Sequence, residues 1–221
     1  RGSGSLEVFR KIGTEELRLR LSINSWEDSH LKATLSGHKK TWFEHPVHSV
    51  YIPVKEMLAN APGFKSLYET RNIHFEEVYA DIITKALLPP LRGPSDTARR
   101  KITSILQKAI DGKITVQKEE FFLRNKQGNL EFTLLAEGFR KLGLLWTLVQ
   151  NGTLLNGSVL FWDEPEANLN PKLIKTLIEV LIELQRMGVQ VFISTHNYVV
   201  LKWFDLLTRD SDEIKYYSLF R

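Results

Sequence analysis

Two adjacent acidic residues, Asp163 and Glu164, directly follow a short apolar run at residues 159–162. Such a run is typical of a strand buried on both faces of a parallel sheet, and ligands bind at the carboxyl ends of these strands. At that position Asp163 can hold Mg²⁺, and Glu164 can orient a water molecule toward a γ-phosphate. Because Pro165 lacks a backbone donor, we expect the strand to stop and both carboxylates to leave the sheet. The simpler alternative is a strand that ends in a solvated acidic turn.

A histidine, His196, follows a second apolar run at residues 189–193. Between the two runs, residues 171–187 place apolar side chains three and four positions apart, which predicts an amphipathic helix with Asn170 as its N-cap. A strand, a helix and a strand in this order form a parallel crossover, so we expect His196 at the same sheet edge as the two carboxylates. An imidazole there can donate a hydrogen bond to a phosphate oxygen. The alternative is a histidine that caps the next helix.

A third segment of interest is the start of a predicted helix at Gly138, whose apolar face contains Leu142, Leu145, Trp146 and Val149. A glycine at this position lets backbone N–H groups approach an anion, and the helix dipole favours negative charge there. Many helices begin in this way, so the segment gains meaning only in combination with the others.

The three segments together resemble motifs of ABC-type ATPases. Residues 135–139 resemble the signature motif, residues 160–165 the Walker B motif, and residues 194–196 the segment that carries the switch histidine. The similarity is to prokaryotic ATPases related to structural-maintenance-of-chromosomes (SMC), DNA-repair and overcoming-lysogenisation-defect proteins, some labelled AAA. It implies an α/β P-loop NTPase core with a mostly parallel sheet, an antiparallel β meander and a helical insertion. In that family two nucleotide-binding domains enclose two ATP molecules, and the signature helix of one faces the phosphate loop of the other.

The resemblance also implies ligands and roles. ATP and Mg²⁺ are the expected ligands, with Asp163 for the metal, Glu164 as catalytic carboxylate and His196 as γ-phosphate sensor. Residues 168–170 fall where the family has its dimer-contacting loop. The nucleotide contacts implied at the signature and this loop are Ala136, Glu137, Gly138 and Asn170. Since Ala136 stands where the family usually has serine, one hydroxyl contact to the partner's γ-phosphate is missing.

One family motif is absent from the sequence. No G-x-x-x-x-G-K-[ST] occurs in the 221 residues, so the chain offers no loop whose amides and lysine could hold the β- and γ-phosphates. In the family this loop lies N-terminal to the segments described above. We therefore expect a chain that starts after the loop and binds ATP poorly alone. The alternative, a natural remnant without nucleotide binding, is disfavoured because both Glu164 and His196 are retained.

The remaining segments are expected to position these motifs. Strict alternation at residues 16–23 predicts a strand, and residues 31–36 and 41–43 continue an antiparallel meander with turns at 24–25 and 37–38. A core strand is expected at 47–53. Where the family then offers a glutamine to the metal, this chain has Glu56 as the candidate substitute. Its simpler interpretation is a charged residue at the start of a helix at 55–60.

The middle of the chain is expected to form a helical insertion. Amphipathic stretches at residues 64–88 and 96–110 flank a proline-rich segment that no helix could cross. Strands follow at 114–116, 120–124 and 130–134, and after His196 a helix at 198–207 and a strand at 214–219 close the sheet. Four parts result: 1–5, a tag or linker; 6–53, an antiparallel β subdomain and core strand; 54–133, a helical insertion with a β hairpin; and 134–221, the signature, Walker B and switch-histidine part.

The composition of the chain indicates its cellular compartment and its candidate partners. The sequence has no cysteine, no membrane-length apolar run and no signal pattern, which predicts a cytoplasmic protein without disulfides. Its 30 basic and 26 acidic residues are mixed, so DNA contact is permitted but not required. The resulting hypothesis is an ATP-hydrolysing domain that forms an ATP-dependent homodimer, with DNA or a nuclease as further candidate partners in DNA maintenance or phage defence. The alternative is a non-catalytic interaction domain that kept the fold but lost the phosphate loop.

Overall fold

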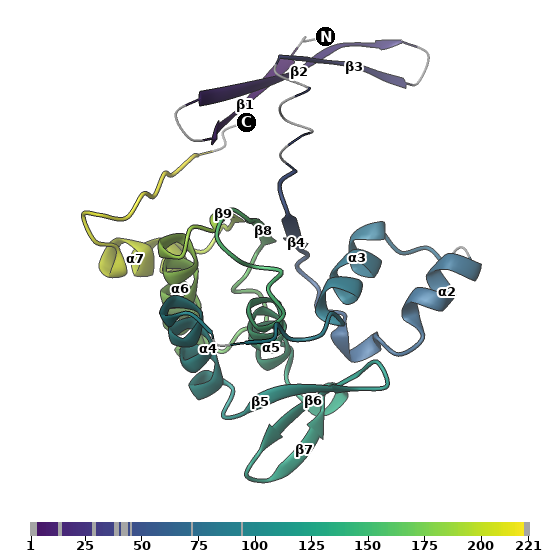
Figure 1. Ribbon diagram of the computed structural model, residues 1–221, viewed down its shortest axis with the longest axis vertical. Helices are drawn as coiled ribbons and strands as arrows, with labels where there is room; N and C mark the ends of the chain where they lie inside the picture. The colour runs from purple at the N-terminus through teal and green to yellow at the C-terminus, as the bar shows by residue number, and fades with distance from the viewer. Residues whose placement is uncertain are drawn as a thin grey trace. The chain divides into compact units, whose positions relative to one another are not determined.

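A computed structural model describes residues 4–12, 15–27, 30–37, 40, 44, 46–71, 73–93 and 95–218 of the chain. The chain divides into two compact units, Arg1–Val47 and His48–Arg221 (Figure 1). Each unit is described by itself. No helix in the described ranges is long and apolar enough to cross a membrane.

The N-terminal unit is an antiparallel meander. Its strands β1 (Gly4–Ile12), β2 (Glu15–Glu27) and β3 (His30–Gly37) pair in the order β1-β2-β3. The meander was predicted, but β1 was not, and it includes two residues of the expected tag or linker.

One predicted turn of the meander is wrong. The register of β2 shifts between Ile23 and Ser25, so Asn24 forms an irregularity inside the strand instead of a turn. A β-bulge accepts one extra residue without ending a strand, which is why β2 continues to Glu27. The strand expected at 41–43, and His38 of the second predicted turn, lie outside the described residues.

The C-terminal unit contains a parallel sheet of three strands, with the order β4-β8-β9. These strands are β4 (Ser49–Ile52), β8 (Val159–Asp163) and β9 (Gln190–Ser194). Helix α6 (Pro171–Arg186) joins β8 to β9, as predicted. Its N-cap is Asn170, whose side chain accepts a hydrogen bond from the Lys172 backbone N–H. The two strands of the predicted crossover are therefore parallel neighbours.

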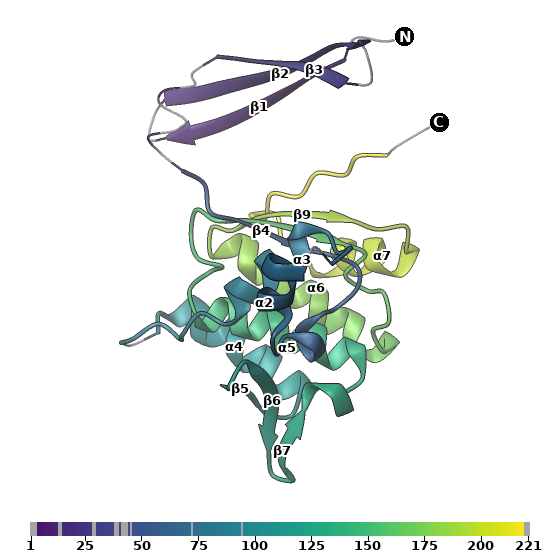
Figure 2. The same cartoon turned by 90° about the vertical axis from the view of Figure 1, so that its right-hand side faces the viewer.

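The two faces of this sheet differ. On the face that the helices pack against, Val50, Leu160 and Trp162 are almost fully buried. On the other face Tyr51 and Phe161 are each 40% exposed, and Phe192 is 46% exposed. Helices α5 (Glu137–Gln150) and α6 lie on the same side of the strands in both views (Figures 1 and 2). The predicted burial of β8 on both faces is thus wrong, because the described helices cover only one.

The helical insertion consists of α2 (Phe64–Arg71), α3 (Glu77–Ala86) and α4 (Thr97–Ala109). The stretch predicted at 64–88 is two helices instead of one. The ring of Phe75, between the helices, packs edge-on against Phe64 at 5.4 Å between centroids. This contact folds α3 back against α2. The helix expected at 55–60 is also shorter, since only a 3₁₀ turn, η1 (Leu58–Asn60), forms.

A second antiparallel sheet follows, made of β5 (Lys113–Gln117), β6 (Glu120–Asn125) and β7 (Gly128–Glu131). The third strand ends earlier than predicted, because Phe132 is buried and begins a 3₁₀ turn, η2 (Phe132–Leu134). Helix α7 (Tyr198–Leu207) matches its prediction.

The strand predicted at 214–219 is wrong for residues 214–218, which are irregular, and the last residue lies outside the described part. Asp212 accepts two hydrogen bonds from the Arg186 guanidinium, at 2.8 and 2.6 Å. Because Arg186 is the last residue of α6, this pair ties the chain just before residues 214–218 to the end of that helix.

Candidate functional site

The carboxyl ends of β8 and β9 form the centre of the candidate site. Asp163 and Ser194 are directly paired in the parallel register, and the Ser194 hydroxyl donates a hydrogen bond to an Asp163 carboxylate oxygen. Asp163 is two residues from Phe161, so its side chain lies on the exposed face of the sheet. The structure therefore places a carboxylate and a hydroxyl side by side at this edge.

Glu164 and His196 meet at the same edge. The Glu164 backbone N–H donates to Ser194 O at 3.0 Å, and its φ of +42° is in the left-handed region, which turns the chain out of the strand. His196 Nδ1 lies 3.0 Å from Glu164 Oε1, and the two side chains are 81% and 36% exposed. The crossover thus places His196 at the same sheet edge as both carboxylates, as the sequence predicted, and in contact with Glu164. The chemical roles of these residues stay predictions.

His196 is held between two anchored neighbours. The Thr195 hydroxyl donates to Glu166 Oε1 and accepts from the Asn197 backbone N–H at 3.0 Å. Asn197 is the N-cap of α7, where its side chain accepts from the Val199 N–H. The alternative in which His196 caps this helix is therefore wrong. Sequence reasoning missed the contribution of Glu166 and Thr195, which no local pattern indicated.

The start of α5 packs tightly against the loop that follows Glu164. A Cβ atom added to Gly138 would lie 2.9 Å from Leu169 Cδ1 and 3.1 Å from Asn168 O, so no larger residue fits without a shift. Ala136 occupies the N-cap position and makes no side-chain cap bond. Glycine at position 138 thus permits a close contact, and its predicted approach to an anion stays a prediction.

Side chains from this helix start and this loop also bond. Asn168, at a φ of +60°, donates from Nδ2 to Glu137 Oε2 at 3.0 Å. Asn170 is exposed, but its side-chain oxygen is engaged by the Lys172 backbone N–H. Two of the predicted nucleotide contacts, Glu137 and Gly138, therefore lie beside the predicted dimer-contacting loop, whereas Asn170 serves as a helix cap.

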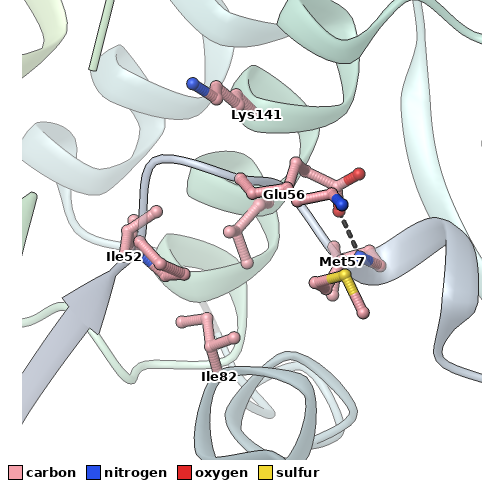
Figure 3. Close-up of a pocket in the computed structure, with 9 residues that line it drawn as sticks. Ile52, Glu56, Met57, Ile82 and Lys141 are labelled. Carbon is pink, nitrogen blue, oxygen red and sulfur yellow. Dashed lines mark hydrogen bonds between the residues drawn. The ribbon is translucent and has the colours of Figure 1, made fainter. Parts of the chain in front are cut away.

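Glu56 lies close to its simpler interpretation, a charged residue at a helix start, but its side chain is buried. It precedes η1, and its Oε1 accepts from the Leu58 N–H, but the residue is only 6% exposed. Its Oε2 lies 3.0 Å from Arg140 Nε. Figure 3 shows Glu56 with Lys141, Ile52 and other side chains that line a small recess. Burial raises the pKa of Glu56 to about 7, and Glu137 adds to the rise, while the Leu58 N–H and Arg140 oppose it. A carboxylate this buried cannot serve as a solvent-facing metal ligand.

Lys141 is the functional candidate that sequence reasoning missed most completely. It is 1% exposed, and its Nζ donates to Ala167 O at 2.8 Å. Burial lowers the pKa of Lys141, and the charges of nearby glutamates oppose that shift: Glu137, Glu166, Glu56 and Glu164. The available signal was its position, because Lys141 adjoins Leu142 and stands four residues before Leu145 in the apolar stripe of α5.

The donor atoms at the strand ends suit Mg²⁺ only with help from a substrate. Among the residues that the structure describes, no three His, Cys, Asp or Glu side chains form a metal-binding group. Asp163 and Ser194 supply hard oxygen atoms. Mg²⁺ in nucleotide sites is usually held by one or two protein oxygens, with phosphate oxygens and water completing the shell. The residues present therefore fit a metal that arrives with a nucleotide.

Comparison with known structures shows what the fold is similar to. The fold is similar to the SMC head domain from Thermotoga maritima, with a TM-score of 0.51 and 15% identity over 92% of this chain and 68% of that one. Weaker matches are an Smc head domain with an extended coiled coil bound to the C-terminal domain of ScpA, from Pyrococcus furiosus (TM-score 0.48, 11% identity, covering 87% and 68%), and a dimeric ATP-binding cassette bound to ADP and Pi (TM-score 0.35, 12% identity, covering 89% and 88%).

Comparison of sequences identifies the family. No curated protein matches the chain. A family model described as "AAA domain, putative AbiEii toxin, Type IV TA system" matches residues 5–202. Since this match spans most of the 221 residues and the fold is that of SMC heads, the chain belongs to this AAA-domain family of P-loop ATPases.

Proposed function

We propose that the chain is the part of an ABC- and SMC-like ATPase that hydrolyses ATP at the ends of β8 and β9. The observation that carries the proposal is the meeting of Asp163, Glu164 and His196 at one sheet edge, with His196 Nδ1 3.0 Å from Glu164 Oε1. Phosphoryl transfer depends mainly on positioning and on electrostatic stabilisation. Two acids and an imidazole fixed on adjacent strands supply both.

Each residue has a proposed role. Asp163, bonded to Ser194, would hold Mg²⁺, which neutralises phosphate charge when bound. Glu164 would orient a water molecule and accept its proton. With a proton on both ring nitrogens, His196 would donate a hydrogen bond from Nε2 to a γ-phosphate oxygen, while Nδ1 donates to Glu164, which fixes the orientation of the ring.

The phosphates need a loop that this sequence does not contain. We propose that a segment outside these 221 residues supplies it and packs on the exposed face of the sheet. The apolar row formed by Tyr51, Phe161 and Phe192 supports this arrangement, because exposed apolar patches mark interaction surfaces. The row lies on the same face as Asp163, so a segment that covers it would place its loop beside the carboxylate.

Dimer formation is the second part of the proposal. The start of α5 and the loop at residues 168–170 are packed together, and Ala136, Asn168 and Asn170 are exposed there. Two elements that are fixed to each other and open to solvent suit contact with a nucleotide on a second copy of the chain. A role in DNA maintenance or phage defence, with DNA or a nuclease as partner, rests on the family likeness alone.

ATP turnover tests the proposal. The chain is assayed together with the polypeptide that carries the phosphate loop, with and without Glu164→Gln. Loss of a catalytic carboxylate should lower turnover by roughly 10²- to 10⁴-fold. The matched control is Glu179→Gln, which changes a partly exposed α6 carboxylate whose ion pair is with Lys175, and it should leave turnover unchanged.

Two outcomes would contradict the proposal. Turnover that does not depend on Glu164 would favour the non-catalytic interaction domain. Near-micromolar affinity of the 221-residue chain alone for ATP would show that no external phosphate loop is needed.

A further inference from the structure

The loop at residues 164–169, here called the acidic loop, has an unusual backbone. Glu164 and Asn168 both adopt positive φ, at +42° and +60°, although neither is glycine. Within the loop, Ala167 N–H donates to Glu164 O and Leu169 N–H donates to Glu166 O, each at 3.0 Å. Residues in this backbone region persist only where their surroundings hold them.

Two sides of the molecule hold the acidic loop. On the sheet side, Ser194 O accepts from Glu164 N–H and the Thr195 hydroxyl donates to Glu166. On the helix side, Lys141 Nζ donates to Ala167 O at 2.8 Å, and Asn168 bonds to Glu137. The bond from Lys141 is the one on the helix side that comes from a buried cation, and its acceptor is the carbonyl between the two internal turns.

Burial of a lysine on the core face of α5 is energetically unfavourable by itself. An unbranched apolar side chain such as methionine would fill the same space without the need to desolvate an ammonium group. The charges of four glutamates compensate for this burial: Glu56, Glu137, Glu164 and Glu166. These four come from the β4–η1 loop, from α5 itself and from the acidic loop. Lys141 therefore lies where the three elements around the site meet.

We infer that Lys141 is a positioning residue that fixes the acidic loop, and with it Glu164, to the start of α5. Its importance for catalysis rests on the proposed function, whereas the contact itself does not. Because α5 begins at the signature residues Glu137 and Gly138, any movement of this helix start is transmitted through Lys141 to the Glu164 backbone. Lys141 thus links the surface proposed to meet a second copy to the proposed catalytic carboxylate.

Amide hydrogen exchange in the ligand-free chain tests the inference. In Lys141→Met, exchange of the Ala167 and Leu169 amides should be faster by roughly tenfold to a hundredfold, the factor that corresponds to a lost charged hydrogen bond. Lys141→Arg keeps a donor and should restore slow exchange. The matched control is Arg99→Met, which removes another buried cation, one that lies on α4 and bonds to Ser95 just before that helix, and the acidic loop should not respond to it.

The inference is overturned if exchange in the acidic loop is unchanged in Lys141→Met, or if it rises equally throughout the chain. Should that variant not fold, NMR of the unsubstituted chain decides. A slowly exchanging Lys141 ammonium with a coupling through the hydrogen bond to the Ala167 carbonyl carbon is expected, and a rapidly exchanging ammonium without it contradicts the inference. Neither the exchange measurement nor the NMR measurement uses ATP. Their outcome therefore does not depend on the outcome of the Glu164 turnover test.

Discussion

Two groups of mostly charged residues surround the acidic loop, and they differ in their exposure to solvent. The strand-end group, made of Asp163, Glu164, Ser194 and His196, is partly or largely exposed. The buried charged cluster, made of Glu56, Arg140, Lys141 and Glu166, is withdrawn from solvent apart from Arg140, which is partly exposed. Both groups contain carboxylates beside cations or potential cations. The difference indicates that the buried charged cluster holds the exposed strand-end group in position.

The energetics of the two groups should differ accordingly. An exposed ion pair contributes about 0–1 kcal/mol to stability, because water screens it and both side chains lose freedom. Removal of one partner from a buried pair costs about 3–5 kcal/mol, because the other charge is left uncompensated. Substitutions in the buried charged cluster should therefore alter the free energy of unfolding, and those in the strand-end group should alter the chemistry with little change in stability.

The largest effect is expected from Glu56, as a dependence of stability on pH. Its folded pKa of about 7 exceeds its ordinary value of 4.5, so the native state binds this proton more tightly than the unfolded state. The stabilisation is complete below pH 4.5 and is lost as pH rises to about 7. It amounts to at most about 3 kcal/mol. Glu137 and Arg140 face the same carboxyl group and change its pKa in opposite directions, and the charge of Glu56 in turn raises the pKa of Lys141.

Glu56→Gln isolates this contribution. Urea unfolding of both proteins at pH 4.5 and pH 8 gives the difference in unfolding free energy, which should shift by about 2–3 kcal/mol in favour of the variant at the higher pH. Glu179→Gln provides the exposed comparison and should show no such shift. If the difference in unfolding free energy between the two proteins were the same at pH 4.5 and pH 8, Glu56 would be ionised in the folded protein, and burial would not raise its pKa.

The second prediction concerns Thr195, which joins the two groups. Thr195→Val removes the donor to Glu166 Oε1, and Glu166 Oε2 already has no hydrogen-bond partner among the described residues. A buried carboxylate left without its bond should destabilise the protein by about 2 kcal/mol. Ser194→Ala is the matched change on the exposed side and should cost less than about 1 kcal/mol. Thermal unfolding would compare them, and equal losses would remove the distinction between the groups.

The third prediction uses two glycines of α5. In Gly138→Ala the new Cβ meets the Asn168 carbonyl and Leu169, whereas in Gly143→Ala it meets only the side chains of Phe132 and Ile114. Steric displacement should outweigh the gain in helix propensity, with a net loss of about 1 kcal/mol for Gly138→Ala. Amide exchange in the acidic loop should rise for this variant alone. If both variants perturb the loop equally, close packing at Gly138 does not restrain it.

Local patterns in the sequence predicted the strand-end group well. The apolar run before Asp163, the spacing along α6 and the Asn170 cap are each encoded within a few residues, and together they imply the crossover that brings His196 to Glu164. The prediction succeeded because parallel strands joined by one helix leave little freedom in topology.

Features that depend on distant contacts were not predictable in the same way. The apolar sequence of β8 did not reveal that Phe161 would be exposed, because exposure depends on which elements cover the sheet. A strand was predicted at 214–219, but residues 214–218 are irregular, and the Arg186–Asp212 pair ties the chain just before them to the end of α6. The burial of Glu56 and Lys141 requires the β4–η1 loop and α5 to meet, which no window of residues encodes.

The smallest effect is expected for the contact between Glu164 and His196. A double-mutant cycle with Glu164→Gln and His196→Asn should give a coupling energy below about 1 kcal/mol in stability, since the imidazole is 81% exposed. The free energy of unfolding of each single variant should differ by less than about 0.5 kcal/mol from that of the unsubstituted chain. In the turnover assay, by contrast, the two substitutions should be strongly non-additive, because residues that act on one phosphate as a unit lose most of their effect once either is gone. A coupling of several kcal/mol in stability would place the pair with the buried charged cluster and assign it a structural role.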